Sequence, residues 1–502
     1  MIKIDLNVKE NNYLRLAQCI CKSNPMHAIV KQPREPFLPS YSHMCREFDI
    51  TSQNNSGRCW IFSACNLLRI NMRALSPDLP GSFELSQTYI FFFDKLEKAN
   101  KFLYNIIETA ELDTDDRTVS FLLSDPIPDG GQWNMFINII EKYGIVSKQA
   151  YGDTFCSDNS AVMNGVLTQV LRTSALEIRE SHQKRSREWV KYANQVKDNC
   201  VKKVYEILVT CLGKPPCKFD FSYVIADGGV QKKVPDVNDD VWVDQIIVRP
   251  LGVEVFGALS DGFLPDKKNE LHGIYKASNH GTLQNAGSAR FVRKDITPKQ
   301  FVKEFVKHRF DEYICLVNDP RNTMYRKYKV KYLGNVIEKT GVYLNVPIET
   351  LREYTTFALK NGIPVWFGAD AQKYMNKMNG HFDEDQFEWE LVFNIPKVQI
   401  KSKSKRLDYS DTQANHAMLF TGIDVNPDKS VNIFRIENSW GKEDGQNGYY
   451  SCTCKWFEDN VFLVAVPMLL MEKFNDEKLW KCFQSTEVTE LNCWDPIGCL
   501  AD

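Results

Sequence analysis

A cysteine, a histidine and an asparagine stand in sequence surroundings that would suit a thiol nucleophile, its basic partner and the amide that orients that partner. Cys59 lies in QNNSGRCWIFSACN, residues 53–66, where small residues precede an apolar run with helical spacing. We expect Cys59 in the first turn of a buried helix, because backbone N–H groups and the helix dipole favour a thiolate there. A nucleophilic thiol also needs a base from another segment.

His416 is the histidine best placed to be that base, since it opens the apolar strand pattern HAMLFTGIDV. The remaining histidines stand in polar or charged surroundings that predict surface positions: His27, His43, His182, His272, His280, His308 and His381. Asn438 ends the next strand pattern, 22 residues after His416, a separation that suits a hairpin. Its side-chain carbonyl can accept a hydrogen bond from one ring nitrogen and leave the other facing the thiol. Taken singly, this histidine and this asparagine would more often be structural.

Gln53 and Trp440 complete the predicted site. Acyl transfer through a thioester passes through an oxyanion, which needs preorganised hydrogen-bond donors. The side-chain amide of Gln53, six residues before Cys59, and the backbone N–H of Cys59 would supply two donors. Trp440, two residues after Asn438, would shield the histidine–asparagine hydrogen bond from water.

The chain as a whole has the composition of a globular protein without a strong electrostatic field. It has 502 residues, of which 43% are hydrophobic, and a formal net charge of −2, which predicts two domains or one fold with large insertions. No stretch approaches the ~18 apolar residues of a membrane span, and the charged N-terminus lacks a signal-peptide core. Fifteen thinly spread cysteines favour free thiols in a reducing compartment, and their spacing does not argue for a metal site.

Helical patterns dominate the first half of the chain and strand patterns the last third. We expect helices at 59–70, 85–103 and 135–144, and over most of 160–212. Strands are expected at 363–370, 417–425 and 431–440. Residues from about 224 to 290 are rich in Gly, Asp, Asn and Lys and read as a loop-like insertion. The fold class is therefore α+β, with a site between the two halves.

These motifs resemble the papain-like cysteine peptidases and, among them, the bleomycin hydrolase and aminopeptidase C family. Q-x5-C-W around Cys59, N-H-A around His416 and E-N-S-W-G around Asn438 follow the same order. Ser56 stands where secreted papain relatives carry a cysteine, and the gap from Cys59 to His416 exceeds the roughly 130 to 150 residues of that group. Other stretches extend the resemblance over nearly the whole chain: LSQTYIFFFDK, DGGQW, EKYGIV, CLGKPP, CLVNDP, VWFGAD and CWDPIGCLAD.

The resemblance implies a two-lobed papain-like fold with a large, mainly helical insertion between the lobes and a C-terminal arm that enters the cleft. The implied parts are the nucleophile-bearing lobe at 1–150, the insertion at 151–310 with its family-atypical stretch at about 224–290, the β-rich lobe at 311–480 and the arm at 481–502. It also implies a cytoplasmic homohexamer that uses no cofactor and no metal.

The resemblance further assigns substrate-binding residues. Gly130 and Gly131 in DGGQW would let the substrate backbone approach closely, and Trp440 is also counted among the substrate-binding residues. Leu500, Ala501 and Asp502 would form the tip of the arm, and the main-chain carboxylate of Asp502 would hold the free amino group of the substrate.

The expected function is a cysteine aminopeptidase that hydrolyses peptides and small amides with a free amino terminus. Cys59 would attack the carbonyl, and His416 would protonate the leaving amine and then activate water. Two alternatives stay open: an endopeptidase or acyl transferase of the same fold, and a ring-shaped scaffold that binds protein or, weakly, nucleic acid. The scaffold's best feature is KSKSKR at 401–406, although such runs are usually solvated and the near-neutral net charge gives them little support.

Overall fold

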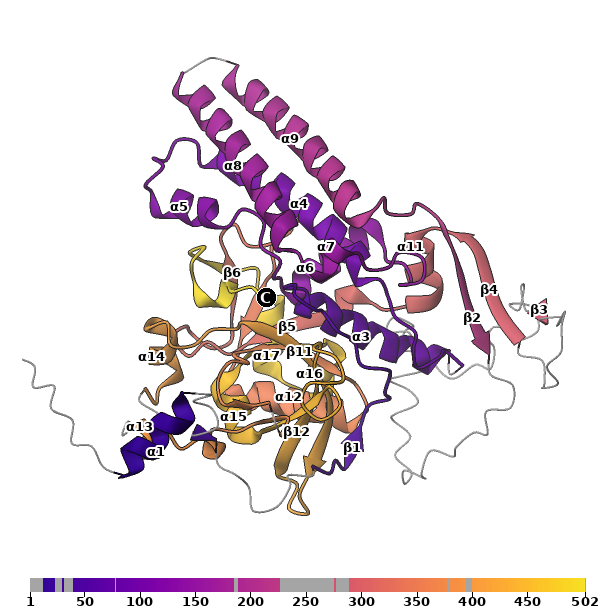
Figure 1. The fold of residues 1–502 in the computed structure, drawn as a ribbon, viewed down its shortest axis with the longest axis vertical. Coiled ribbons are helices and arrows are strands. Elements are labelled where there is room, and N and C mark those ends of the chain that lie inside the picture. Colours follow the sequence, from indigo (N-terminus) through magenta and orange to yellow (C-terminus); the bar gives the residue numbers. More distant parts are fainter. Residues whose placement is uncertain are drawn as a thin grey trace, which may run out of the picture.

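A computed structural model of the chain shows an α+β fold in which helices gather in one part and a large sheet in the other (Figure 1). The end of the chain lies between these two parts in the same view. The structure describes residues 12–22, 29–30, 39–76, 78–184, 188–225, 275–276, 289–377, 379–393 and 400–501. The two-lobed arrangement predicted from the sequence is therefore present.

The helical part is formed by the first half of the chain. It contains α3 (Cys59–Leu75), α4 (Gln87–Glu108), α5 (Arg117–Ser124), α6 (Trp133–Tyr143), α7 (Phe155–Asp158), α8 (Ala161–Gln183) and α9 (Trp189–Leu212). Helix α4 begins where the Ser86 side chain accepts the N–H of Tyr89, and α6 ends where Gly144 adopts a φ of +78°. Helices α8 and α9 pack together as a long hairpin (Figure 1).

Helix α3 lies in the interior between the helical part and the sheet. Its apolar side chains, including Trp60, Leu67 and Leu68, are fully buried. It contacts α4 and α6 on one side and strand β11 on the other. Because residues 59–70 of α3 are all buried, the position of its first turn is fixed by packing from both lobes.

The large sheet carries the rest of the site. Its strands run in the order β15-β6-β7-β5-β14-β8-β11-β12-β13-β10-β9, with β1 paired to β11. Their bounds are β1 (His43–Met44), β5 (Tyr313–Val317), β6 (Arg326–Val330), β7 (Tyr343–Asn345), β8 (Val365–Ala369), β9 (Met375–Asn376), β10 (His381–Phe382), β11 (His416–Val425), β12 (Val431–Glu437), β13 (Tyr449–Thr453), β14 (Val461–Pro467) and β15 (Val488–Leu491).

Strands β11 and β12 form the predicted hairpin. They are antiparallel, with Leu419 opposite Glu437 and Phe420 opposite Ile436. On its other side β11 pairs with β8, and His416 lies opposite Ala369. This register brings His416, the first residue of β11, and Asn438, which follows β12, to the same end of the hairpin.

Shorter elements surround these two parts. The remaining helices are α1 (Asn12–Cys21), α11 (Pro298–Phe301), α12 (Ile348–Lys360), α13 (Trp389–Phe393), α14 (Lys403–Asp408), α15 (Cys454–Asn460), α16 (Leu469–Phe474) and α17 (Glu477–Gln484). Single turns occur at η1 (Val302–Val306), η2 (Phe310–Glu312), η3 (Glu384–Gln386) and η4 (Pro496–Gly498). Among the described helices, none combines the length and the apolar character that a membrane crossing requires.

A second, small sheet joins strands β2 (Phe219–Ile225), β4 (Ala289–Ile296) and β3 (Tyr275–Lys276). Strands β2 and β4 are antiparallel, and their aromatic side chains pack on the helix that follows, with the rings of Phe221 and Phe301 4.9 Å apart. Most of the predicted insertion at about 224–290 lies outside the described residues.

The prediction that His381 is a surface residue was wrong. Its side chain is 3% exposed, because β10 pairs with both β9 and β13 and turns the ring toward Ser451. The ring Nδ1 lies 2.7 Å from the Ser451 hydroxyl. Burial lowers the pKa of His381 to about 4, so the ring is neutral near pH 7. His308, also predicted at the surface, is half-buried, with its ring centroid 4.7 Å from that of Tyr313.

Candidate active site

The thiol of Cys59 lies at the interface between the two lobes. Cys59 is the first residue of α3, as predicted, and its side chain is fully buried. The backbone N–H of Ala417 donates to the Cys59 Sγ at 3.3 Å. The Ser63 Oγ is 2.7 Å from the carbonyl oxygen of Cys59 and 2.8 Å from that of Ala417. These contacts fasten the first turn of the helix to the start of the strand that carries His416.

His416 is oriented by two neighbours. Its Nε2 is 2.9 Å from the Asn438 Oδ1, which also accepts the backbone N–H of Ser439 at 2.8 Å. Since this oxygen can only accept, Nε2 carries a proton, and Nδ1 is the ring nitrogen that remains for proton transfer. The Trp440 ring stacks on the imidazole with centroids 4.7 Å apart. The hairpin therefore brings these three side chains together beside Cys59.

The Gln53 amide is held in one orientation. Its Nε2 donates to the carbonyl oxygen of Ser56 at 2.7 Å, and its Oε1 accepts the Ser439 hydroxyl at 2.6 Å. The backbone N–H of Gln53 donates to the Ser439 carbonyl at 2.8 Å. Because Ser439 follows Asn438, the chain segment that orients His416 also fixes the Gln53 amide.

A buried acid joins the nucleophile helix to the strand that precedes Asn438. The Glu437 carboxylate accepts the Asn66 amide at 2.7 Å and pairs with Arg69 at 3.3 Å. Burial raises the pKa of Glu437, and the two nearby arginines, Arg69 and Arg435, oppose that rise. This contact ties α3 to β12 and so fixes the distance between their functional side chains.

The DGGQW segment lies against the same helix. The Trp60 indole N–H donates to the Asp129 carbonyl at 3.0 Å, and the Asp129 carboxylate accepts the N–H of Gly57 at 3.2 Å. Burial alone would raise the pKa of Asp129, but the ion pair with Lys95 at 2.5 Å holds that pKa well below its usual range. A Cβ on Gly131 would lie 2.4 Å from the Trp60 ring, so this close packing requires glycine.

The end of the chain pairs with this segment as a short antiparallel strand. The Gly131 N–H donates to the Ala501 carbonyl at 3.0 Å, and the Ala501 N–H donates to the Gly131 carbonyl at 3.2 Å. A Cβ on Gly130 would lie 2.7 Å from the Ala501 oxygen. Gly130, Gly131 and Ala501 are therefore brought together, whereas Asp502 lies outside the described residues.

Sequence reasoning missed Gln132, although it quoted the motif that contains it. The Gln132 side chain is 1% exposed, and its Nε2 donates to the carbonyls of Ile497 at 3.0 Å and Cys499 at 2.6 Å. Its Oε1 accepts the hydroxyl of Tyr343. Gln132 thus holds the arm at Ile497 and Cys499, close to the point where Ala501 pairs with Gly131. Only the position of Gln132 directly after two glycines could have drawn attention to it.

This arrangement defines the class of protein. A thiol at a helix N-terminus, a histidine oriented by an asparagine, and a fixed side-chain amide are the parts of a cysteine peptidase, here on a papain-like two-lobed fold. Within the described part of the chain, no group of three or more His, Cys, Asp or Glu side chains is arranged to hold a metal ion.

Comparisons with known proteins agree with this class. The model of the Peptidase C1-like family matches residues 3–244 and 284–498, and the chain belongs to that family. The chain is 34% identical over 498 residues to an aminopeptidase C of Listeria innocua serovar 6a, covering 98% of this chain and 96% of the relative. It is 32% identical to the bleomycin hydrolase of Homo sapiens, over 90% of this chain and 86% of that protein. The crystal structure of PepW from Lactobacillus rhamnosis HN001 superposes with a TM-score of 0.79 at 29% identity, covering 97% of this chain and 95% of that one.

Proposed function

We propose that the protein is a cysteine aminopeptidase that acts on peptides and small amides with a free amino terminus. The observation that carries the proposal is the pairing of Ala501 with Gly131 beside the nucleophile helix. A cleft blocked in this way by the chain's own end leaves little room for substrate on that side. The relatives named aminopeptidase C and bleomycin hydrolase support the same reading.

The proposed chemistry assigns one role to each side chain. Cys59 gives its thiol proton to the Nδ1 of His416 and attacks the carbonyl carbon as a thiolate, and His416 then passes that proton from Nδ1 to the leaving amine. The Gln53 amide and the backbone N–H of Cys59 hold the oxyanion. His416 then activates water, which cleaves the thioester and restores the thiol. Asn438 keeps the ring in position for both steps, and the Trp440 ring covers the Asn438–His416 hydrogen bond.

The arm would determine where the enzyme cuts. Ala501 pairs with the backbone of Gly131, and we propose that an extended substrate would otherwise bind at this position. We propose that the terminal carboxylate of Asp502 binds the α-amino group of the substrate as an ion pair. A substrate blocked at that amine would lose the ion pair and would bring an acyl group against the arm.

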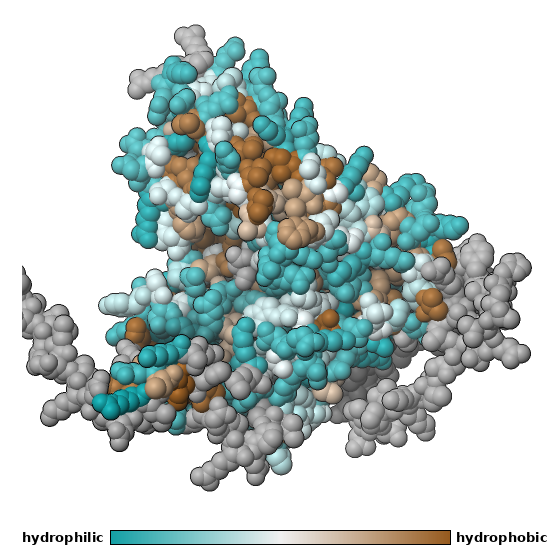
Figure 2. All heavy atoms as spheres, viewed as in Figure 1, coloured by the Kyte–Doolittle hydropathy of each residue, from teal (hydrophilic) through white to brown (hydrophobic). Residues whose placement is uncertain are grey.

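We also propose a homohexamer in the cytoplasm. Exposed apolar side chains on the α8–α9 hairpin support self-association, and Figure 2 shows apolar residues gathered over these helices. They include Val162, Val166, Leu176, Val190 and Tyr192. A sedimentation-velocity run would test the hexamer, since the monomer has a mass of 57.9 kDa.

The rival scaffold function receives less support. Within KSKSKR, the Lys403 ammonium donates to the carbonyls of Glu458 at 3.0 Å and Val461 at 2.7 Å. Arg406 is buried and bonds to Asp411 at 3.1 Å. Two of the four basic groups are therefore engaged inside the protein, which leaves a short run of exposed charge for nucleic acid.

The experiment that tests the proposed function compares aminoacyl fluorogenic amides with their N-acetylated counterparts, using Cys59→Ala as the blank. Cleavage of the free-amine substrates alone supports an aminopeptidase whose arm blocks the cleft. Equal cleavage of acetylated substrates would favour an endopeptidase. No cleavage above the blank would refute the enzyme and leave the scaffold as the better hypothesis.

A further inference from the structure

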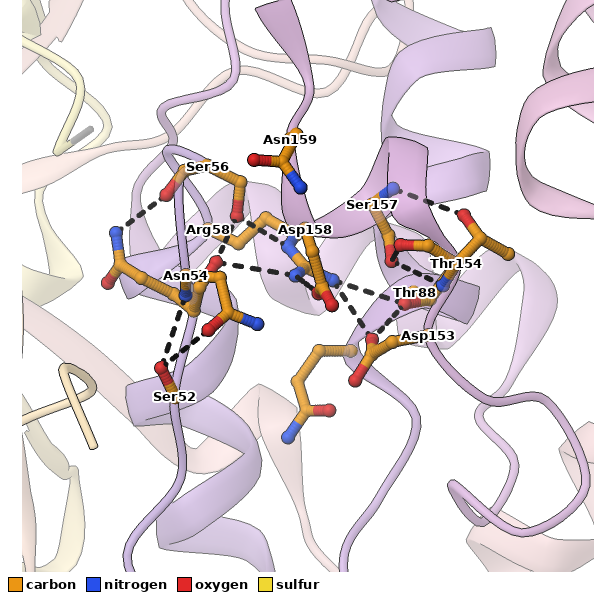
Figure 3. A network of polar contacts seen from close by, with 12 residues as sticks. Ser52, Asn54, Ser56, Arg58, Thr88, Asp153, Thr154, Ser157, Asp158 and Asn159 are labelled. Atoms are coloured by element: carbon orange, nitrogen blue, oxygen red, sulfur yellow. Dashed lines mark hydrogen bonds and ion pairs between the residues drawn. The ribbon is translucent and has the colours of Figure 1, made fainter. Parts of the chain in front are cut away.

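Arg58, the residue before the nucleophile, is fully buried, and the chemistry proposed above gives it no role. A buried guanidinium is costly unless its donors are satisfied, so its partners identify what it holds in place. Figure 3 shows Arg58 at the centre of a polar network that links the Gln53–Ser56 turn to helix α4 and to the segment around α7.

One side of the guanidinium binds the turn that carries the oxyanion donor. Its Nε donates to the Ser56 Oγ at 2.8 Å, and its Nη2 lies 3.4 Å from the Gln53 carbonyl oxygen. The Ser56 hydroxyl donates to that same carbonyl at 2.6 Å, while the Gln53 side chain donates back to the Ser56 carbonyl at 2.7 Å. Arg58 therefore closes a ring of contacts that includes the Gln53 amide.

The other side binds rigid parts of the helical lobe. Nη1 donates to the Thr88 hydroxyl at 3.1 Å and to Asp153 at 3.2 Å, and Nη2 pairs with Asp158 at 3.0 Å. Phe62 and Phe91 cover the guanidinium, with ring centroids 5.1 and 5.6 Å away. Asp153 and Asp158 both pair with the guanidinium, and Asp153 also pairs with Lys148 at 3.0 Å. The charge of Arg58 is therefore used within this cluster and is not directed at the thiolate.

We propose that Arg58 is a positioning residue for the oxyanion donor. Its planar fork holds the Gln53–Ser56 turn against α4 and α7, and this keeps the Gln53 amide aimed at the carbonyl oxygen that becomes negative in the transition state. The inference rests on the proposed hydrolysis. It predicts that loss of Arg58 affects transition-state stabilisation through Gln53 and leaves the reactivity of the thiol unchanged.

The test is a double-mutant cycle of Arg58→Met and Gln53→Ala, with Arg58→Lys as a variant that keeps the charge and loses the fork. Arg58→Met and Arg58→Lys are each expected to lower kcat on a free-amine substrate by about 30-fold, with KM changed by less than about twofold. In the Gln53→Ala background, Arg58→Met should lower kcat by less than about threefold, because the group that it positions is already absent.

Alkylation of Cys59 by iodoacetamide separates positioning from charge. This reaction displaces iodide from carbon and forms no oxyanion. The alkylation rate of Arg58→Met and its pH profile should therefore equal those of the wild type. A shifted alkylation profile would mean that the guanidinium charge acts on the thiolate, and would overturn the proposal. Additive losses in the cycle, or full activity of Arg58→Lys, would overturn it as well.

A matched control is Arg179→Met, which removes another buried arginine from the helical lobe. Arg179 donates to the Thr109 carbonyl at 3.2 Å and has no contact with the site. It should leave kcat within about twofold of the wild type in the fraction that is folded. If Arg58→Met does not fold, Asp158→Asn takes its place in the cycle and should show the same dependence on Gln53 with a smaller loss. Inactive wild-type protein would refute the proposed function itself, which is a different result from an additive cycle.

Discussion

Truncation of Gln132 should loosen the C-terminal arm and let the enzyme accept substrates whose amino terminus is blocked. Gln132→Ala removes the donor that holds the carbonyls of Ile497 and Cys499. It leaves the direct pairing of Gly131 with Ala501 in place. The arm would then remain the preferred occupant of the cleft but would leave it more often.

The size of the effect follows from the two lost hydrogen bonds. A neutral hydrogen bond contributes about 1 kcal/mol net, so the docked arm loses about 2 kcal/mol. Since 1.4 kcal/mol is a factor of ten, the fraction of molecules with a displaced arm should rise about 30-fold. The kcat/KM for an N-acetylated amide should rise by a similar factor, as long as the displaced state is still the minority.

The assay measures kcat/KM for one aminoacyl amide and its acetylated form in the wild type, in Gln132→Ala and in Asn138→Ala. Asn138 lies on α6, the helix that begins directly after Gln132, and donates to Asn335 at 3.2 Å without contacting the arm. It therefore controls for general loosening of that helix. An unchanged ratio of the two substrates in folded Gln132→Ala would refute the idea that Gln132 holds a blocking arm. An equal rise in Asn138→Ala would refute it too.

Three further changes test other contacts. Asn438→Ala removes the acceptor of the His416 Nε2 proton, so kcat on free-amine amides should fall about 10- to 100-fold, and an unchanged kcat would contradict the assigned role. Gly130→Ala places a Cβ 2.7 Å from the Ala501 oxygen, so steady-state assays should show faster cleavage of acetylated amides; the opposite change would argue against a blocking arm. Because burial lowers the pKa of His381 to about 4, the unfolded chain binds more protons as the pH falls from about 6.5 to 4. Stability should then drop by up to about 3 kcal/mol over that window, and urea unfolding at several pH values should give a flatter profile for His381→Gln. An equally steep profile in the variant would show that other groups cause the loss.

The placement of the residues that we propose to react was predictable, because each stands at a position with a local pattern in the sequence. Cys59 precedes an apolar helical run, and His416 and Asn438 sit at the ends of two strand patterns of hairpin spacing. The helix start at Cys59 and the antiparallel pairing of β11 with β12 follow those patterns. Local sequence patterns were therefore enough to predict the α+β class, with helices early in the chain and strands late.

What the sequence could not predict depends on contacts between distant segments. His381 stands among acidic residues, yet pairing of β10 with β13 buries it, and the pairing partner is 70 residues away. Gln132 and Arg58 look like ordinary polar residues, because their partners lie up to 367 and 100 residues away in the chain. The basic run at 401–406 looked solvated, but its residues 403–406 lie in α14, where Lys403 and Arg406 point inward.

If the arm blocks the cleft as proposed, the pairing of Ala501 with Gly131 makes the ligand that competes with substrate a part of the enzyme's own chain. A tethered ligand has an effective concentration set by its tether, on the order of millimolar for a short flexible one, and dilution does not lower it. A long peptide must therefore compete against the same effective concentration of the arm in a nanomolar enzyme solution and in a concentrated one. Selectivity against such peptides should therefore be independent of enzyme concentration, and a free peptide with the same terminal residues should be a weak inhibitor.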